Sequence, residues 1–229
     1  SYTVTVTAGK GISSTSGSGT YKFEEAVSIG AQLATGYENI TYTGDKTTTS
    51  FNMPSSDIEV TASASPITYS ITYTLNGGSL TTDNPTSYNI ETADFTLNNP
   101  SKQGYTFIGW SGTSLTGNDN KEVTIALGSS GNREYTANFE ASSGIGYTVK
   151  HYLEKLDGTY ELKDTDNLSG VTGSEVTPDT KTYEGFTSPS KKSLTIKADG
   201  TASLDYQYTR NSYTVTVTAG KGISSTSGS

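Results

Sequence analysis

The strongest constraint on this chain is a repetition, because its first 18 residues, SYTVTVTAGKGISSTSGS, return unchanged at residues 212–229. The offset between the two copies, 212 minus 1, is 211 residues. That period is far longer than the roughly 20–50 residues of a solenoid or propeller repeat, so one period must hold several domains. We therefore expect one full period of a tandem array, followed by the start of the next.

Composition favours strands and turns over helices. Thr and Ser make up 72 of the 229 residues (40 plus 32), beside 25 Gly and 16 Tyr. The net charge of -8 disfavours nucleic acid and anionic membrane surfaces as partners. The absence of cysteine excludes disulfides, thiolate metal sites and a thiol nucleophile.

Hydrophobic alternation divides the period into three modules with the same order of parts. Each begins with an alternating strand, at Tyr2–Ala8, Ile67–Leu75 and Tyr147–Leu153. Each then has a glycine–aromatic pair and a closing alternating strand. The predicted boundaries are 1–65, 66–142 and 143–211, with 212–229 as the partial start of the next repeat. Modules of roughly 65–75 residues bury only a modest share of their surface, so each should be marginally stable.

The second module resembles the Listeria/Bacteroides repeat, also called the internalin B-repeat. The resemblance rests on ITYTLNGGSL (71–80), NPTSY (84–88), NPSKQGYTFIGWSG (99–112) and YTANF (135–139). The first module, with YTVTVTAGKG, GTYKFEEAVSIGA, GYENITYTGD and MPSSDIEVTASA, resembles the divergent form of that repeat. The third, with YTVKHYLEKLDGTYE, GFTSPS and YQYTRN, is similar to the mucin-binding-protein (MucBP) type of repeat.

These resemblances imply small β-grasp-like modules strung along secreted or wall-anchored bacterial proteins. The fold expectation is therefore mainly β, within the β-rich α+β class, with three tandem modules in an elongated array. The pattern also allows a single helical turn at 23–26.

Candidate chemical residues are few. His151 is the only histidine, and alternation places it on the same face as Val149 and Leu153. A half-buried histidine with a backbone partner is therefore favoured over a catalytic base. The acidic pairs Glu24-Glu25, Asp119/Glu122 and Asp164/Asp166 suggest acid/base carboxylates or a cation site, but such pairs in surface turns are usually solvated. Around Asp119 the glycine and glutamate spacing of a calcium loop is missing.

Aromatic residues raise the alternative of a binding module. Trp110 and the tyrosines can stack on sugar rings, yet most of them occupy inward positions of the alternation. Packing in the core or across strands is therefore the favoured interpretation, and Trp110 is predicted to be a core residue of the second module.

The sequence thus predicts a non-catalytic repeat segment of a bacterial cell-surface protein, acting as a stalk or adhesive spacer that presents other domains. The alternative is a carbohydrate- or host-protein-binding module. No catalytic, metal or cofactor residue is assigned, and no cofactor is expected. We expect no nucleic acid partner and no membrane insertion, while a host protein, matrix protein or glycan stays open as a ligand. The location is expected to be extracellular and wall-attached, with signal and anchor outside these residues.

The repeated segment 212–229 carries a strand pattern without the rest of its module. A lone strand with one apolar face has no core to bury, so we expect it to add to a sheet edge of the preceding module or of a neighbouring chain. Exchange with its identical copy at Tyr2–Ala8 would let the segment self-associate.

Overall fold

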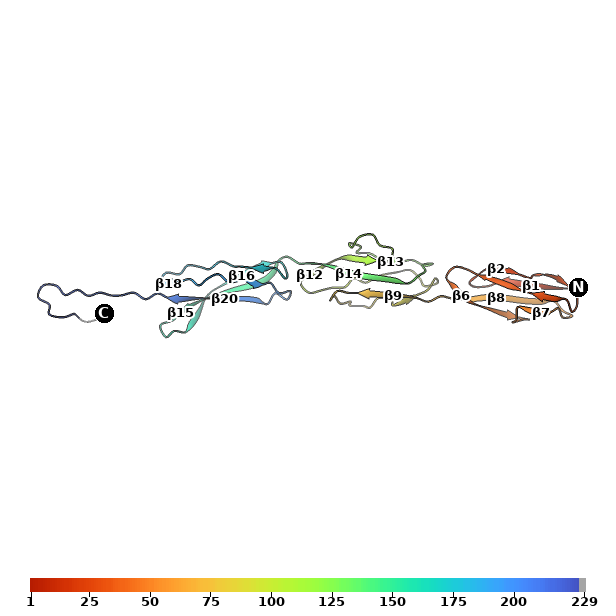
Figure 1. Cartoon of the computed structure of the whole chain (residues 1–229), viewed down its shortest axis with the longest axis horizontal. Coiled ribbons are helices and arrows are strands. Elements are labelled where there is room, and N and C mark those ends of the chain that lie inside the picture. The colour runs from red at the N-terminus through yellow and green to blue at the C-terminus, as the bar shows by residue number, and fades with distance from the viewer. Residues whose placement is uncertain (227–229) are drawn as a thin grey trace. The chain divides into compact units, whose positions relative to one another are not determined.

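A computed structural model describes residues 1–226 of the chain (Figure 1). Strands and turns account for its regular structure, and no helix occurs among the described residues. Three small modules follow one another along the chain, each with its own four-stranded sheet. The mainly β fold expected from composition is therefore confirmed, and the segment 23–26 forms a turn at Phe23–Glu24 rather than a helical turn.

By packing, the chain divides into two compact units. The first comprises residues 1–100 and 108–138, and the second comprises residues 101–107 and 139–229. The first module and most of the second thus belong to one unit, while the segment 101–107, which includes the start of a strand of the second module, groups with the third module. This division follows contacts and is coarser than the three modules, which are defined by their sheets.

The first module is built on a parallel pair of strands formed by its two ends. Its sheet has the order β3-β1-β8-β6, comprising β3 (Gly19–Tyr21), β1 (Tyr2–Ala8), β8 (Ile58–Pro66) and β6 (Tyr37–Gly44). Strand β1 runs parallel to β8, from Val4 opposite Ile58 to Ala8 opposite Ala62, and both edge strands are antiparallel. Two small antiparallel pairs complete the module: β2 (Ile12–Ser16) with β5 (Gly30–Leu33), and β4 (Ala26–Ser28) with β7 (Ser50–Asn52).

The alternation in the sequence explains which side of this sheet is buried. Val4 and Val6 are 1% and 6% exposed, whereas the threonines between and beside them face solvent. They meet residues of the β4–β7 layer and of β8 in one core cluster, which contains Val4, Val6, Val27, Ile29, Met53, Ile58 and Val60. One apolar face on each layer is enough to close a small two-layer core.

The second module repeats this plan. Its sheet has the order β10-β9-β14-β12, comprising β10 (Ser87–Tyr88), β9 (Tyr69–Thr74), β14 (Arg133–Ala141) and β12 (Tyr105–Gly112). Again the first and last strands are parallel, with Tyr73 opposite Tyr135. A small pair, β11 (Phe95–Thr96) with β13 (Thr124–Ile125), takes the place of β4 and β7.

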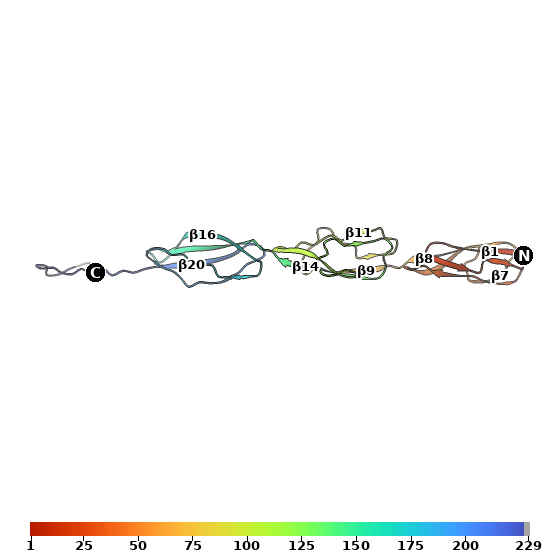
Figure 2. The same ribbon diagram turned by 90° about the horizontal axis from the view of Figure 1, so that it is seen from above.

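The third module has the longest strands (Figure 2). Its sheet has the order β16-β15-β20-β18, comprising β16 (Tyr160–Gly170), β15 (Ile145–Glu154), β20 (Ala202–Arg210) and β18 (Phe186–Thr187). Strands β15 and β20 form the parallel pair, and β17 (Glu175–Val176) pairs with β19 (Leu194–Thr195) as the small second layer. The register between β15 and β16 shifts between His151 and Tyr152, which marks a β-bulge.

Trp110 is a core residue of the second module, as predicted. Its side chain is fully buried, at 0% exposure, and its indole Nε1 donates a hydrogen bond to Asn99 Oδ1 at 3.0 Å. The ring packs edge-on against Tyr73 and Tyr135, with centroid distances of 5.9 and 6.5 Å. A large aromatic body with its one donor satisfied is a stable arrangement for a buried tryptophan.

We predict that Trp110→Ala lowers the free energy of unfolding of the second module by about 3–5 kcal/mol, because it leaves a large cavity between two rings. Loss of that amount is enough to unfold a marginal module. Chemical denaturation followed by circular dichroism measures the change. Leu127→Ala is the matched control, since Leu127 is 63% exposed. Equal midpoints for the two variants would contradict the central role of Trp110.

The repeated segment behaves differently from its first copy. Residues 213–219 form no strand with any described residue, and Val215 and Val217 are 63% and 47% exposed. Their counterparts Val4 and Val6 are buried in β1, which lies between β3 and β8. The expected addition to the preceding module is therefore not observed. Because β1 is an interior strand, its replacement by the second copy requires the first module to open.

We predict that the chain forms head-to-tail oligomers by strand exchange when it is unfolded and refolded at high concentration. A chain shortened to residues 1–211 should refold as a monomer, because it lacks the second copy of β1. Light scattering after size-exclusion chromatography measures the mass of both chains. Oligomers of equal abundance without residues 212–229 would rule out the exchange.

Candidate functional site

The single histidine lies inside the third module. His151 is on β15, where alternation points its ring to the same side as Val149, and its exposure is 0%. The ring packs against Tyr206 and Tyr208, with centroid distances of 5.8 and 5.7 Å. The sequence analysis placed His151 on the inward face correctly, but expected only half burial and a backbone partner.

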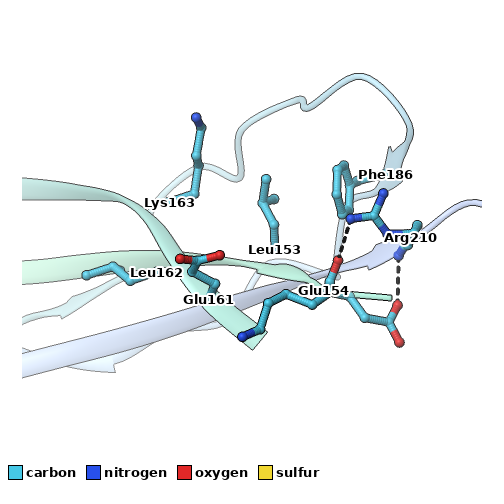
Figure 3. A pocket seen from close by; sticks show the side chains of 8 residues that line it. Leu153, Glu154, Glu161, Leu162, Lys163, Phe186 and Arg210 are labelled. Atoms are coloured by element: carbon cyan, nitrogen blue, oxygen red, sulfur yellow. Dashed lines mark hydrogen bonds between the residues drawn. The ribbon is translucent and has the colours of Figure 1, made fainter. Parts of the chain in front are cut away.

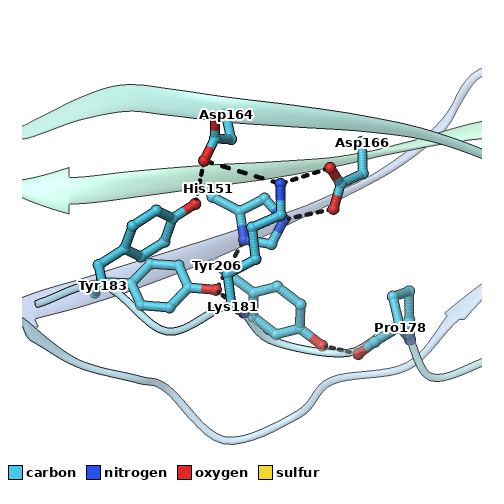
Figure 4. Close-up of polar contacts among 8 residues, drawn as sticks. His151, Asp164, Asp166, Pro178, Lys181, Tyr183 and Tyr206 are labelled. Atoms are coloured by element: carbon cyan, nitrogen blue, oxygen red, sulfur yellow. Dashed lines mark hydrogen bonds and ion pairs between the residues drawn. The ribbon is translucent and has the colours of Figure 1, made fainter.

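Both ring nitrogens of His151 bond to side chains instead (Figure 4). Nδ1 lies 2.8 Å from the Tyr208 hydroxyl, and Nε2 lies 3.1 Å from Asp166 Oδ2. The Tyr208 hydroxyl also accepts the backbone N–H of Lys181 at 2.8 Å, so its own proton is left to donate. A carboxylate only accepts, hence Nε2 carries the ring proton and Nδ1 accepts from Tyr208.

Charged groups surround this network on its outer side. Lys181 Nζ donates to Asp166 Oδ1 at 2.6 Å and lies 3.8 Å from Asp164 Oδ2. The Tyr183 hydroxyl donates to Asp164 at 2.6 Å, and burial raises the pKa of Tyr183 well above its usual range. The hydrogen bond from Lys181 holds the pKa of Asp166 below its ordinary value, with a smaller contribution from His151. The same pair raises the pKa of Lys181, so both groups stay charged at neutral pH.

This network resembles a proton relay in its order of groups, but it reaches solvent through its carboxylates and Lys181 and not through His151. A general base needs a substrate within hydrogen-bond reach, and both His151 and Tyr208 are fully buried. The contacts instead connect β15, β16 and β20 to the loop that carries Lys181. Its physical effect is to fix the positions of four chain segments in a module whose apolar core is small.

The acidic pair Asp164/Asp166 was expected in a solvated surface turn, and that expectation is wrong. Both residues lie within β16, where Asp164 is opposite His151 and Asp166 is opposite Val149. Their side chains are 41% and 34% exposed and share Lys181. The two-residue spacing, which puts both carboxylates on one face of a strand, is the signal that marks them.

The other acidic candidates serve local turns or remain on the surface. Glu25 Oε2 accepts the backbone N–H of Lys22 at 2.7 Å and so closes the turn after β3. Asp119 and Glu122 are exposed residues of the loop between β12 and β13. Within residues 1–226, no cluster of three or more histidine, cysteine or acidic side chains is arranged to hold a metal ion.

A groove of about 440 Å³ opens at the end of the third module's sheet where β15 ends and β16 begins (Figure 3). Leu153, Leu162 and Phe186 give it an apolar part, and Arg210 lies beside Phe186 with the guanidinium 4.9 Å from the ring centre. Arg210 also donates through its backbone N–H to Glu154 Oε2 at 2.8 Å and through Nη2 to the Glu154 carbonyl at 3.1 Å. The groove therefore offers shape and mixed charge, but no nucleophile paired with a base.

Exposed aromatic side chains do not gather anywhere on the described surface. Of the 16 tyrosines, only Tyr213 is exposed, and it belongs to the repeated segment. The other tyrosines are buried or half-buried in the three sheets. With Phe23, the exposed aromatic side chains of residues 1–226 are two, and they lie in different compact units, so neither has an exposed aromatic neighbour in its own unit. Across the same residues, no helix is present that is long and apolar enough to cross a membrane.

Comparison with known families assigns the first two modules. Residues 2–67 match the divergent InlB B-repeat domain, and residues 69–132 match the Listeria-Bacteroides repeat domain. These matches confirm two of the three resemblances seen in the sequence, and neither extends into the third module. No curated protein matches the chain. Repeat domains of these families are typical of bacterial extracellular surface proteins and are non-catalytic structural domains.

We predict that Asp166→Asn reduces the acid sensitivity of the third module. A carboxyl group whose pKa is lower in the folded state stabilises the fold above its unfolded pKa, and this contribution is lost as pH falls through the folded value. The wild-type chain should therefore lose stability below about pH 4, the range of an ordinary aspartate. The variant should be less stable at neutral pH and show a smaller further loss on acidification.

Denaturant midpoints measured between neutral pH and acid test this expectation. Asp205→Asn is the control, because Asp205 is an exposed residue of β20. Parallel pH profiles for the wild type and Asp166→Asn would show that the carboxylate does not stabilise the fold.

Proposed function

We propose that this chain is a spacer segment of a bacterial cell-surface protein, in which tandem modules hold other domains away from the cell wall. The observation that carries the proposal is the repetition of 18 residues at an offset of 211, since it makes the modules parts of a longer array. An array of small domains gains reach with each period. Thr- and Ser-rich outer faces of the strands keep such an array soluble.

The residues considered as candidates for catalysis or ligand stacking are buried, which supports a structural role. His151 and Trp110 are fully inside their modules, where each completes a core. The family matches of the first two modules agree with this role. The third module shares the order of strands of the other two, and we propose that it is a repeat of the mucin-binding-protein type serving the same array.

The groove beside Arg210 favours one second candidate, a module that binds a carbohydrate or a host or matrix protein. Leu153, Leu162 and Phe186 provide apolar contact there, and Glu161 and Lys163 provide charge. Of the two bonds from Arg210 to Glu154, only the one from Nη2 uses the guanidinium, which is therefore only partly engaged. We rank this candidate second because apolar ligand sites usually bury more of their lining than an open groove does.

The test displays a reporter domain on a bacterial surface at the end of one, two or three copies of residues 1–211. We predict that the accessibility of the reporter to a large antibody rises with each copy, because the modules add length. A scrambled Gly/Ser linker of equal residue number is the control, since a flexible chain gains end-to-end distance only as the square root of its length. Accessibility that does not depend on copy number would contradict the spacer role.

Binding is tested with the same segments on panels of glycans and matrix proteins. Saturable binding that disappears in Phe186→Ser, while circular dichroism shows an intact fold, would favour the second candidate over the spacer.

A further inference from the structure

Every module presents the same glycine turn at one end. Gly36, Gly104 and Gly185 each precede an aromatic residue and have φ values of 83°, 74° and 81°. The carbonyl of each glycine accepts a backbone N–H from just beyond the module's last strand, at 2.9, 3.0 and 2.9 Å; the donors are Ile67, Ser142 and Asn211. The glycine turn therefore lies where the chain leaves the module.

Every module also has a second shared turn, which follows its second sheet strand. We call it the entry turn; its three copies are Lys22–Glu25, Asn89–Thr92 and Val171–Ser174. In each, the N–H of the fourth residue bonds to the carbonyl of the first, at 3.1, 3.0 and 3.1 Å. The second residues of the three entry turns are Phe23, Ile90 and Thr172.

Where one module follows another in the described chain, the entry turn covers the preceding glycine turn. A Cβ atom added to Gly36 would lie 2.6 Å from Ile90 Cδ1 and 3.1 Å from Ile90 Cβ, so a larger residue there would have to displace Ile90. In the second compact unit, Thr172 Oγ1 donates to the Gly104 carbonyl at 2.7 Å, and a Cβ at Gly104 would lie 2.6 Å from Ala198. The second residue of the entry turn is thus the contact residue in both cases.

The hairpin turn of the preceding module adds a second contact in the first compact unit. Lys10 is the second residue of the turn Gly9–Ile12, and its ammonium group pairs with the carboxylate of Glu91. The Tyr37 hydroxyl donates to the same carboxylate at 2.7 Å. The third residue of the entry turn, Glu91, is therefore held by the module that comes before it.

One glycine turn and one entry turn remain uncovered in the described residues. A Cβ added to Gly185 would have no described atom within 4 Å, in contrast to Gly36 and Gly104. Phe23 is 58% exposed, although Ile90 is half-buried and Thr172 is buried at the same turn position. Leu156, which has the position of Lys10 in the hairpin turn Lys155–Gly158, is 92% exposed.

We propose that these uncovered surfaces bind each other in the array: the entry turn of a first-type module docks on the glycine turn of the third-type module before it. The occupant is the module that residues 212–229 open, because that segment repeats residues 1–18 directly after Asn211. The residue of that module equivalent to Phe23 covers Gly185 and contacts Leu156. At this junction an apolar contact therefore takes the place of the Lys10–Glu91 pair, which joins the first and second modules.

Shape and charge on the third module agree with this occupant. A depression of about 220 Å³ lies beside Gly185's hydrogen-bond partner, lined in part by Leu156, Arg210 and Asn211. Lys155 also lines this depression and carries a positive charge next to Leu156, and Glu24, the residue after Phe23 in the entry turn, carries the opposite charge. The contact is independent of the proposed function, since a spacer and an adhesive array contain the same junction.

The test uses the whole chain extended after Ser229 with a copy of residues 19–67, which completes a second first-type module. Because the chain has no cysteine, spin labels can be placed at Thr195→Cys and at Thr43→Cys of the appended module. Double electron–electron resonance spectroscopy then gives the distribution of distances between the two spin labels, which lie on either side of the junction. We expect a narrow distribution that broadens about twofold with Phe23→Ser in the appended module, since domains without a fixed interface move relative to each other.

The same substitution at residue 23 of the original first module is the matched control. It should leave the distribution narrow, and its melting curve shows whether a first-type module tolerates the change. Leu156→Ser tests the contact from the other side and should broaden the distribution as well. A broad distribution in the unsubstituted chain, or a narrow one that survives both Phe23→Ser in the appended module and Leu156→Ser, would overturn the proposal.

Discussion

The parallel pairing of first and last strands is the constraint on which every module depends. In the first module β1 and β8 bring Val4 opposite Ile58, and in the third β15 and β20 bring Tyr147 opposite Ala202. These pairs join residues more than 50 positions apart, so a module gains its central contacts only when its whole chain is in place. The edge strands and the small second layer then complete a core around this pair.

The three modules fill that core with different chemistry. The first uses aliphatic side chains such as Val4 and Val60, and the second places Trp110 between tyrosines. The third buries His151 and compensates for its polarity with Tyr208 and Asp166. Burying a polar ring costs free energy unless both nitrogens are bonded, and here both are. One strand order therefore tolerates apolar and polar interiors, provided that the buried groups are satisfied.

Glycine at the module ends links the fold to the array. At Gly36 and Gly104 the backbone has a positive φ, and an added Cβ would be crowded by Ile90 and by Ala198 respectively. Gly185 has the same positive φ, but a Cβ added to it would have no described atom within 4 Å. The glycine–aromatic pair is thus a turn signal within a module and also an element of the surface that the following module contacts.

Much of this architecture was readable from the sequence. The exact return of 18 residues set the period, and period-two alternation identified the opening and closing strands and the inward faces of Trp110 and His151, because side-chain direction in a strand depends only on local geometry. The tertiary structure alone decided the rest. It paired the two ends of each module in parallel, brought Asp166 and Lys181 to His151, and placed Ile90 over Gly36. Those contacts join residues distant in the sequence, and their partners are set by how the strands assemble rather than by any local pattern.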